Sequence, residues 1–284
     1  MKHRWMPALA GIALILLLHA AQAAERGLLW KIEPPGAPAS YLFGTIHTDD
    51  ERVTDFSPEL LQALQQSKRF VMEVLPPRDF SLFMLKQGTL RDHLSAAEIE
   101  QVLRQADEHA ITETLALRMK PWLLASVYTL PRAQSMFYQD IQLYALAQQY
   151  HLQLTGLEPA EEHFSALDDL TMDEQLTLLR GVLGLSQPQK EQAFDAVVRA
   201  YVARDVEQIL VADEQWSGMQ LPDALWNKVQ ALLLDRRNER MAQRIVEQAG
   251  GEALFVAVGA AHLGGDSGLV ARLRQAGLKV TPLQ

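Results

Sequence analysis

Six short apolar or alternating runs along this chain have the length and composition of β-strands. Ala253–Val258 is an uninterrupted apolar run rich in Val, Leu and Phe, which predicts a strand buried on both faces. The first two runs flank a segment rich in Pro and Gly, which predicts a hairpin. The predicted strands are Leu28–Ile32, Ser40–Phe43, Arg69–Val74, Leu152–Leu157, Ala253–Val258 and Lys279–Leu283.

Between these runs, apolar residues recur at helical spacing. Ser57 followed by Pro58 is typical of a helix start, and Ser95-x-x-Glu98 is a capping box. Most of residues 79–149, and much of residues 160–250, are predicted to be helical. The order of elements predicts an α/β fold, in which flanking helices and a large helical insertion at roughly 79–149 surround a central mixed sheet.

Two of the predicted strands end in the same pattern, Gly-x-x-His. One supplies Gly44 and His47, the other Gly259 and His262. The bare pattern is weak, because 16 glycines and 8 histidines in 284 residues make a chance match common. Its place at two strand ends is more informative, and we expect the two imidazoles to form one site. The alternative is that each is a hydrogen-bonded histidine at a sheet edge.

Two glutamates stand out in the predicted strands. Glu73 lies in the run Arg69–Val74, where burial without a partner is costly, so it either points outward at a sheet edge or has a cationic or metal partner. Glu158 follows the predicted strand Leu152–Leu157. It is either a site residue or a charge in the first turn of the next helix, favoured there by the helix dipole.

The first 23 residues are typical of a secretory signal peptide. Lys2 and Arg4 precede the apolar segment Ala8–Leu18, and Ala21-Gln22-Ala23 is a small-x-small cleavage site. The apolar segment is shorter than the roughly 20 residues of a membrane span. We therefore expect cleavage after Ala23 and export to the periplasm, with an uncleaved anchor as the alternative.

Composition narrows the possible partners of the mature chain. Without Lys2 and Arg4 it carries 24 basic and 35 acidic residues, a net charge of −11, which argues against nucleic acid or an anionic membrane. The absence of cysteine excludes disulfides and thiol catalysis. The length fits a single domain over residues 24–284, and no second stretch is long and apolar enough to span a bilayer.

Several segments together resemble the TraB/GumN family, whose relatives include the Tiki metalloproteases and, more distantly, erythromycin esterase and ChaN-like folds. The resemblance covers essentially the whole mature chain in the right order. The segments that carry it are LLWKI, SYLFGTIHTDD, RFVMEV, DIQLYALAQQYHLQLTGLEPAEEHF, LLDRRNERMAQRI and ALFVAVGAAHLGGDSGLVARLRQAGLKVTPL.

The resemblance implies one polar site made of the two Gly-x-x-His motifs and a strand glutamate. Its Arg-Asn-x-x-Met motif falls on Arg237, Asn238 and Met241, within a charged run that by itself is typical of a solvated helix face. Its Leu-Glu turn falls on Leu157-Glu158, and this chain has His163 where a glutamine is expected beyond that turn. The implied substrate-binding residues are Gly44, Glu158, Asn238 and Gly259.

Two neutral imidazoles and a carboxylate are suitable ligands for a divalent ion. We therefore expect His47, Glu73 and His262 to bind manganese, cobalt or zinc, and Arg237 to stabilise charge during a metal-assisted hydrolysis, most simply of a peptide. Glu73 is either a ligand or the general base. The alternatives are a metal-free esterase-like hydrolase and a non-catalytic protein that binds peptide or glycan, as the family's links to pheromone shutdown and polysaccharide gene clusters suggest.

Overall fold

The computed structural model of the chain describes residues 26–132, 135, 137–217 and 221–283. The predicted signal peptide, residues 1–23, lies outside the described residues, so its cleavage after Ala23 stays a prediction. None of the helices formed by the described residues has both the length and the apolar character needed to cross a bilayer.

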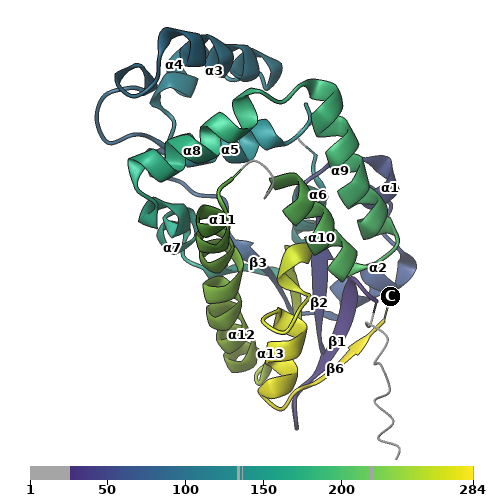
Figure 1. Cartoon of the computed structure of the whole chain (residues 1–284). Helices are drawn as coiled ribbons and strands as arrows, with labels where there is room; N and C mark the ends of the chain where they lie inside the picture. The colour runs from purple at the N-terminus through teal and green to yellow at the C-terminus, as the bar shows by residue number, and fades with distance from the viewer. Residues whose placement is uncertain (1–25, 133–134, 136, 218–220, 284) are drawn as a thin grey trace, which may run out of the picture.

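A six-stranded mixed sheet forms the base of the molecule (Figure 1). Its order is β4-β3-β5-β2-β1-β6, in which β4, β3, β5 and β2 run parallel and β1 and β6 are antiparallel additions. This confirms the predicted fold class and hairpin, and each strand begins and ends within two residues of its prediction. The strands are β1 (Leu29–Glu33), β2 (Ser40–Thr45), β3 (Arg69–Val74), β4 (Gln153–Glu158), β5 (Leu254–Gly259) and β6 (Lys279–Pro282).

Helices lie against the sheet and also form a layer above it, which contains α3, α4, α5 and α8 (Figure 1). The capping box at Ser95 opens α3 as predicted. The helices are α1 (Glu51–Thr54), α2 (Pro58–Gln66), α3 (Ala96–Glu108), α4 (Glu113–Arg118), α5 (Pro121–Thr129), α6 (Gln139–Gln149), α7 (Ala160–Phe164), α8 (Met172–Leu183), α9 (Gln187–Val202), α10 (Val206–Ser217), α11 (Asp223–Gln230), α12 (Arg236–Ala249) and α13 (Leu269–Gln275). Short 3₁₀ turns are η1 (Phe80–Phe83), η2 (Leu90–Asp92), η3 (Ala166–Asp169) and η6 (Ala260–His262).

The central strand β5 is buried from Leu254 to Val258, as its apolar run predicts. Phe255 on this strand lies 6.0 Å from the ring of Phe70 and 6.3 Å from the ring of Phe43, so one aromatic row crosses three neighbouring strands. Aromatic contacts of this kind stabilise a core beyond the area that they bury. The sheet is therefore a rigid base for the chain that leaves its strand ends.

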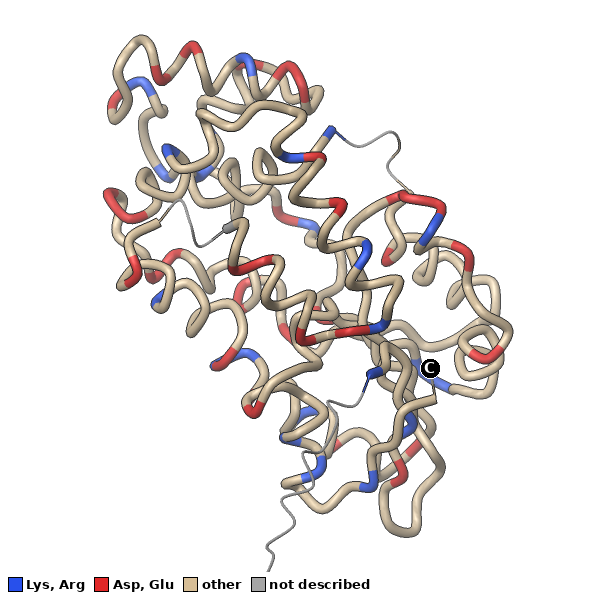
Figure 2. Tube along the Cα trace, turned by 45° about the vertical axis from the view of Figure 1, so that its right-hand side comes forward, with Lys and Arg blue, Asp and Glu red and all other residues tan. Residues whose placement is uncertain are grey.

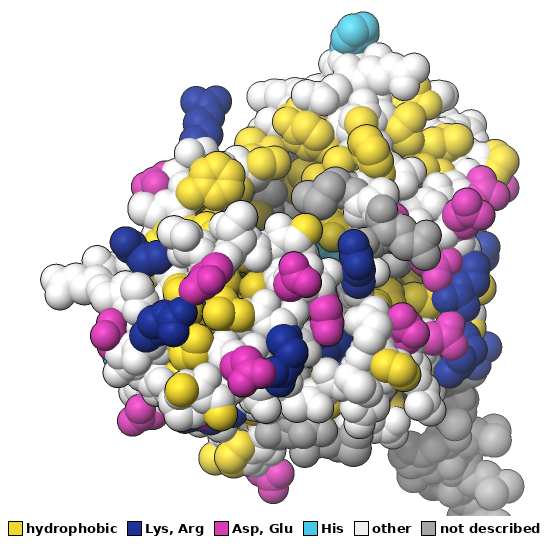
Figure 3. Space-filling view, turned by 90° about the horizontal axis from the view of Figure 1, so that it is seen from above, with side chains coloured by type: hydrophobic (Ala, Val, Ile, Leu, Met, Phe, Trp, Pro, Cys, Tyr) yellow, Lys and Arg dark blue, Asp and Glu magenta, His cyan; other side chains and the backbone are white. Residues whose placement is uncertain are grey.

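The described residues contain two hydrophobic clusters. The first joins the sheet to α2, α6, α9, α10, α12 and α13. The second joins α3, α4 and α5 to α8 and α11, so helices of the predicted insertion pack against helices from beyond β4. Charged residues of both signs are scattered along these helices (Figure 2), and hydrophobic side chains gather on the surface at the helical end of the molecule (Figure 3). The assignment of one domain to residues 24–284 stays a prediction.

Gly44 lies where β2 passes under the turn η6. A Cβ at this position would lie 2.6 Å from the Leu263 side chain and 3.0 Å from the Ala260 backbone. We expect Gly44→Ala to lower the free energy of unfolding by about 1–3 kcal/mol through overpacking, as measured by urea denaturation. Gly184→Ala is the matched control, because no atom lies within 4 Å of its added methyl; an equal loss in both variants would contradict the prediction.

Candidate functional site

The candidate site lies at the carboxyl edge of the parallel strands. Glu158 is the last residue of β4, Glu73 is next to last in β3, Gly259 ends β5, and His47 follows the end of β2 by two residues. Because β4, β3, β5 and β2 are parallel neighbours, these ends meet on one side of the sheet. Ligands of open α/β sheets bind outside this edge.

Glu73 is fixed by two donors. Its Oε1 accepts a hydrogen bond from the Gly259 N–H at 2.5 Å, and its Oε2 accepts one from the Arg237 guanidinium at 2.5 Å. Burial raises the pKa of Glu73, but the electrostatic interactions with His262 and Arg237 and the hydrogen bond from the Gly259 N–H outweigh burial and hold the pKa well below its usual range. Of the two alternatives for Glu73, the structure has the one with a cationic partner, Arg237, and not an outward position on an edge strand, because β3 lies between β4 and β5.

Arg237 bridges Glu73 to a second buried carboxylate. Its Nη2 donates to Oε2 of Glu158 at 2.7 Å, and the Glu158 side chain is fully buried. His163 Nδ1 lies 2.9 Å from the same oxygen. Burial raises the pKa of Glu158, but hydrogen bonds from His163 and Arg237 outweigh it and lower the pKa to about 2. The first-turn interpretation of Glu158 is wrong, since the residue belongs to β4 and is paired with Arg237.

A π-helical turn, η5 (Ala231–Asp235), joins α11 to α12 immediately before Arg237. Such turns are rare and frequently occur at functional sites. Beyond it, Arg236 is exposed, whereas Arg237 and Asn238 are buried. The interpretation of the charged run as a solvated face is therefore wrong for Arg237 and Asn238.

His262 is held in one tautomer. Its Nδ1 lies 2.6 Å from Oδ1 of Asn238, and the amide of Asn238 is itself oriented by donating from Nδ2 to the Ser267 carbonyl at 3.1 Å. An amide oxygen only accepts, so Nδ1 carries the proton and Nε2 presents its lone pair. Burial lowers the pKa of His262 to about 4, so the ring is neutral at neutral pH. Arg237 Nη1 donates to the Nε2 lone pair at 3.2 Å, and Oε1 of Glu73 lies 3.6 Å from Nε2.

His47 has a partner of its own. Its Nδ1 lies 2.6 Å from Oδ2 of Asp140, near the start of α6, and Thr45 donates to Oδ1 of the same carboxylate at 2.5 Å. The charge of Asp140 raises the pKa of His47 to about 9. The His47 side chain is 69% exposed. Its Nε2 edge is therefore accessible from the pocket next to it.

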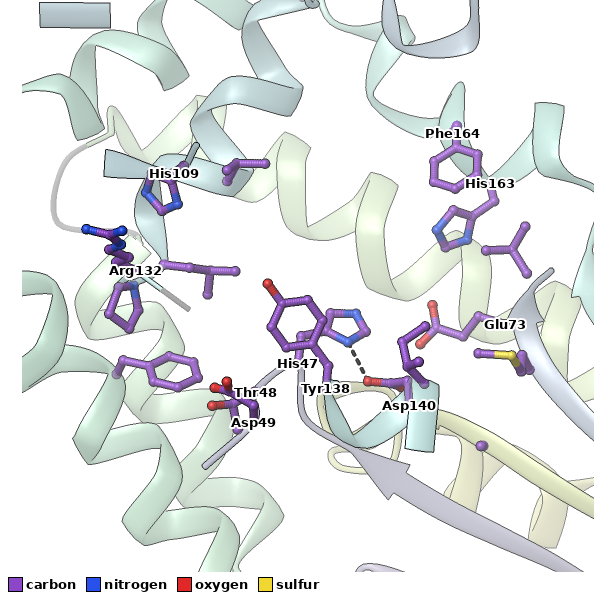
Figure 4. Close-up of a pocket in the computed structure, with 18 residues that line it drawn as sticks. His47, Thr48, Asp49, Glu73, His109, Arg132, Tyr138, Asp140, His163 and Phe164 are labelled. Carbon is purple, nitrogen blue, oxygen red and sulfur yellow. Dashed lines mark hydrogen bonds and ion pairs between the residues drawn. The ribbon is translucent and has the colours of Figure 1, made fainter. Parts of the chain in front are cut away.

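A pocket of about 580 Å³ covers this edge of the sheet. Glu73 and His163 line one part of its wall, and His47, Tyr138 and Asp140 line the middle (Figure 4). Much of the remaining wall is apolar. The volume is in the range of small-molecule sites. His262 and Arg237 lie behind Glu73 and are not among the residues that line the pocket.

The structure thus brings Glu73, His262, Arg237, Asn238 and Glu158 into one network, with His47 on the wall of the adjoining pocket. Gly259 contributes the N–H that binds Glu73. Gly44 packs under Leu263 and is not among the pocket-lining residues, while its carbonyl accepts a hydrogen bond from Tyr201 at 2.6 Å. That these residues bind substrate or an ion stays a prediction.

Sequence reasoning missed Asp140 and the partnership of His163. Asp140 lies 93 residues from His47. It begins one of the segments that resemble the family, but nothing in the local pattern indicates that it pairs with His47. The sequence does show that His163 stands where the family resemblance implies a glutamine. In the structure this residue takes part in the same charge network, beside Glu158 and Arg237.

The described residues offer one group of three donors close enough to hold a metal ion: Glu73, Glu158 and His163, whose ligand atoms lie within 4.8 Å of one another. Arg237 Nη2 already lies among them, 2.5 Å from Oε2 of Glu73, 2.7 Å from Oε2 of Glu158 and 3.0 Å from Nδ1 of His163. A divalent ion there would stand beside a fixed positive charge, so this group does not fit an ion while Arg237 stays in place.

The predicted ligand set has a more suitable chemistry. His47 and His262 each have Nδ1 tied to an oxygen acceptor, which leaves Nε2 as the ligand atom, and metal-binding histidines are commonly held in this way. Glu73 stays ionised beside them. The donor types suit a divalent ion of the manganese, cobalt or zinc kind. In the described structure, however, the three ligand atoms do not all lie within 4.8 Å of one another, and Nε2 of His262 already lies 3.2 Å from a guanidinium nitrogen of Arg237. The structure therefore does not bring the predicted ligand set together as one ion site.

A family model described as the TraB/PrgY/gumN family matches residues 28–282. The chain belongs to this family. The matched residues include every strand of the sheet, from β1 to β6. The architecture described above is therefore that of a TraB/PrgY/gumN protein.

Two relatives are Metalloprotease TIKI1 and Metalloprotease TIKI2 of Xenopus tropicalis, 23% and 22% identical over 93% and 92% of this chain. An uncharacterized protein of Treponema pallidum (strain Nichols) is 25% identical over 63% of this chain. The matches cover 63%, 60% and 58% of those proteins, so this chain spans about three fifths of their length. No solved structure matches the chain.

The His47–Asp140 pair gives a prediction on charge. Asp140→Asn should lower the pKa of His47 from about 9 toward its ordinary 6.5, because the carboxylate charge is the largest cause of the shift. Imidazole NMR signals followed through a pH titration measure this. Asp49→Asn is the control, since Asp49 lines the same pocket but does not contribute to the shift. An unchanged His47 pKa in Asp140→Asn would show that a group other than Asp140 stabilises the protonated imidazole.

Arg237 gives a prediction on stability. Arg237→Met should lower the free energy of unfolding by about 3–5 kcal/mol, because it leaves the buried carboxylates of Glu73 and Glu158 without their cation. The neighbouring Arg236→Met should change the free energy of unfolding by about 1 kcal/mol or less. The Arg236 side chain is 62% exposed, and its ion pair with Asp169 is long, at 3.7 Å. Chemical denaturation of both variants measures the difference, and equal losses would contradict it.

Proposed function

We propose that this chain is a metal-assisted hydrolase that cleaves amide bonds of peptides. The observation that carries the proposal is the ionised Glu73 on the pocket wall, with the lone pair of His262 Nε2 behind it and the open edge of His47 beside it. The metalloprotease names of the two Tiki relatives support the same reaction class.

Glu73 is the proposed proton acceptor. Its low pKa keeps it ionised at neutral pH, and the Gly259 N–H and Arg237 fix its orientation through separate oxygens. Each of these oxygens has a further lone pair with which to accept a proton from water at the pocket wall. General base catalysis by a positioned carboxylate contributes about 10²–10⁴-fold in rate.

The proposed ion ligands are His47 and His262, which ion binding would draw together beside Glu73, since the three donors do not all lie within 4.8 Å of one another in the described structure. A bound ion supplies Lewis-acid polarisation of the substrate carbonyl and lowers the pKa of its water. Around it, Asn238 keeps Nε2 of His262 deprotonated, and Asp140 orients His47, which must release its proton to act as a ligand. Arg237 keeps Glu73 ionised.

A second candidate is a metal-free hydrolase with the His47–Asp140 pair as its proton-transfer group. The specific observation in its favour is Arg237, which already supplies the positive charge among Glu73, Glu158 and His163. Both candidates place the reaction in the pocket. Both keep the expectation, based on residues 1–23, that the enzyme acts in the periplasm.

The test is digestion of a peptide library by protein stripped with a chelator, before and after manganese, cobalt or zinc is returned. We expect about one ion per chain and turnover that depends on it. Glu73→Gln keeps the side-chain shape and should lower kcat/KM by about 10²–10⁴-fold. His262→Ala should abolish turnover, while His93→Ala, an exposed histidine far from the strand ends, should not.

The outcomes separate the candidates. Full turnover in the stripped protein, lost in His47→Ala, supports the metal-free hydrolase and contradicts the ion. Absence of turnover with every ion contradicts both hydrolases and favours a protein that only binds its ligand. Because His262 is buried, its variant is compared by circular dichroism with the natural chain before its activity is interpreted.

A further inference from the structure

The pocket has a second end that the proposed reaction does not use. His109 and Arg132 lie at the side opposite to Glu73 and His163, and His47 and Tyr138 lie between the two ends (Figure 4). The ionised groups near the sheet have partners: Glu73 pairs with Arg237, and Asp140 with His47. The charged residue at the second end differs in this respect.

Arg132 follows α5 and has no hydrogen-bond or ion-pair partner in the part of the chain that the structure describes. Some exposed arginines of the described residues pair with a carboxylate, as Arg52 does with Asp195, while others, such as Arg118, have no side-chain partner there either. What sets Arg132 apart is its place on the pocket wall. A guanidinium offers a planar fork of donors that matches a carboxylate. At a pocket wall, an arginine with no described partner is available to a ligand.

His109 provides a second, independent indication. Its Nε2 is buried and has no hydrogen-bond partner among the described residues. A buried polar atom without a partner costs free energy unless water or a ligand forms a hydrogen bond with it. The ring stacks on Tyr128 at 5.6 Å, and the Tyr128 hydroxyl donates to the Val102 carbonyl at 3.1 Å. The imidazole is therefore held in place with one nitrogen unsatisfied, and it lines the pocket that Arg132 also lines.

The wall between the two ends is apolar. It is formed by side chains from α5, the loop after it, α6 and α9: Val127, Leu130, Pro131, Ile141 and Phe194. A ligand that fits has an apolar body with an anionic group at one end. The volume of about 580 Å³ accommodates a few residues of a peptide rather than a long chain.

We propose that Arg132 and His109 bind the C-terminal carboxylate of the substrate, so that the enzyme acts on short peptides with a free C-terminus and an apolar side chain. Arg132 pairs with the carboxylate charge, and His109 donates from Nε2. This inference rests on the proposed function for the bond that is cleaved. It adds the class of substrate and the residues that select it.

The test measures binding without turnover. The ligand is acetyl-Leu-Phe in which a CH₂–NH linkage replaces the amide bond between the two residues, prepared as the free acid and as the C-terminal amide. We expect the natural chain to bind the acid about tenfold more tightly than the amide, the size of one charge-assisted hydrogen bond. Isothermal titration calorimetry on the full chain gives both dissociation constants.

Arg132→Gln should reduce the preference for the acid to about twofold or less, and Arg132→Lys should restore part of it. Arg118→Gln is the matched control, an exposed arginine of the same helical layer away from the pocket, and should keep the full preference. An equal preference in Arg132→Gln, or none in the natural chain, would overturn the proposal. So would tight binding of an acetyl-Leu-Asp amide, because the charge recognised would then be a side chain.

Failure of this inference is distinguishable from failure of the proposed function. Carboxylate selection through Arg132 without turnover of any peptide would leave the binding site standing and overturn the hydrolase. Turnover of peptide amides as fast as peptide acids, with no preference in binding, would do the reverse.

Discussion

The structure depends on one buried arginine. Arg237 is placed between Glu73 and Glu158, two carboxylates that end neighbouring parallel strands and have little contact with water. Burying either carboxylate without a cation would cost several kcal/mol. The pairing therefore ties α12 to the sheet edge. It also keeps an ionised carboxylate at the pocket wall, where burial without a cation would favour the neutral acid.

The arrangement at the sheet edge follows from topology. The parallel order β4-β3-β5-β2 brings Glu158, Glu73, Gly259 and the chain leading to His47 to one side, although they come from four distant parts of the sequence. Helices then supply what the strands cannot. Asp140 comes from α6, His163 from α7, and Arg237 with Asn238 from α12. The pocket lies where the sheet layer meets the helical layer.

The strands could be predicted closely from the sequence, because a strand buried on both faces needs a continuous apolar run, as in Leu254–Val258. Glu73 could be singled out for the same reason, as a charge within such a run. Asp140, His109 and Arg132 could not. Asp140 contacts a residue 93 positions away, and His109 and Arg132 line the pocket from different helical segments. The short-range periodicity of a sequence carries no information on such contacts.

The π-helical turn at Ala231–Asp235 has a consequence for the length of this helix. One residue corresponds to about 100° of rotation around a helix axis. Deleting a single residue there would leave a regular and still amphipathic helix, yet it would rotate everything beyond it away from the sheet edge. Surface loops tolerate such a change in length easily, but this short stretch does not. The extra residue of the turn sets the direction in which the Arg237 guanidinium points.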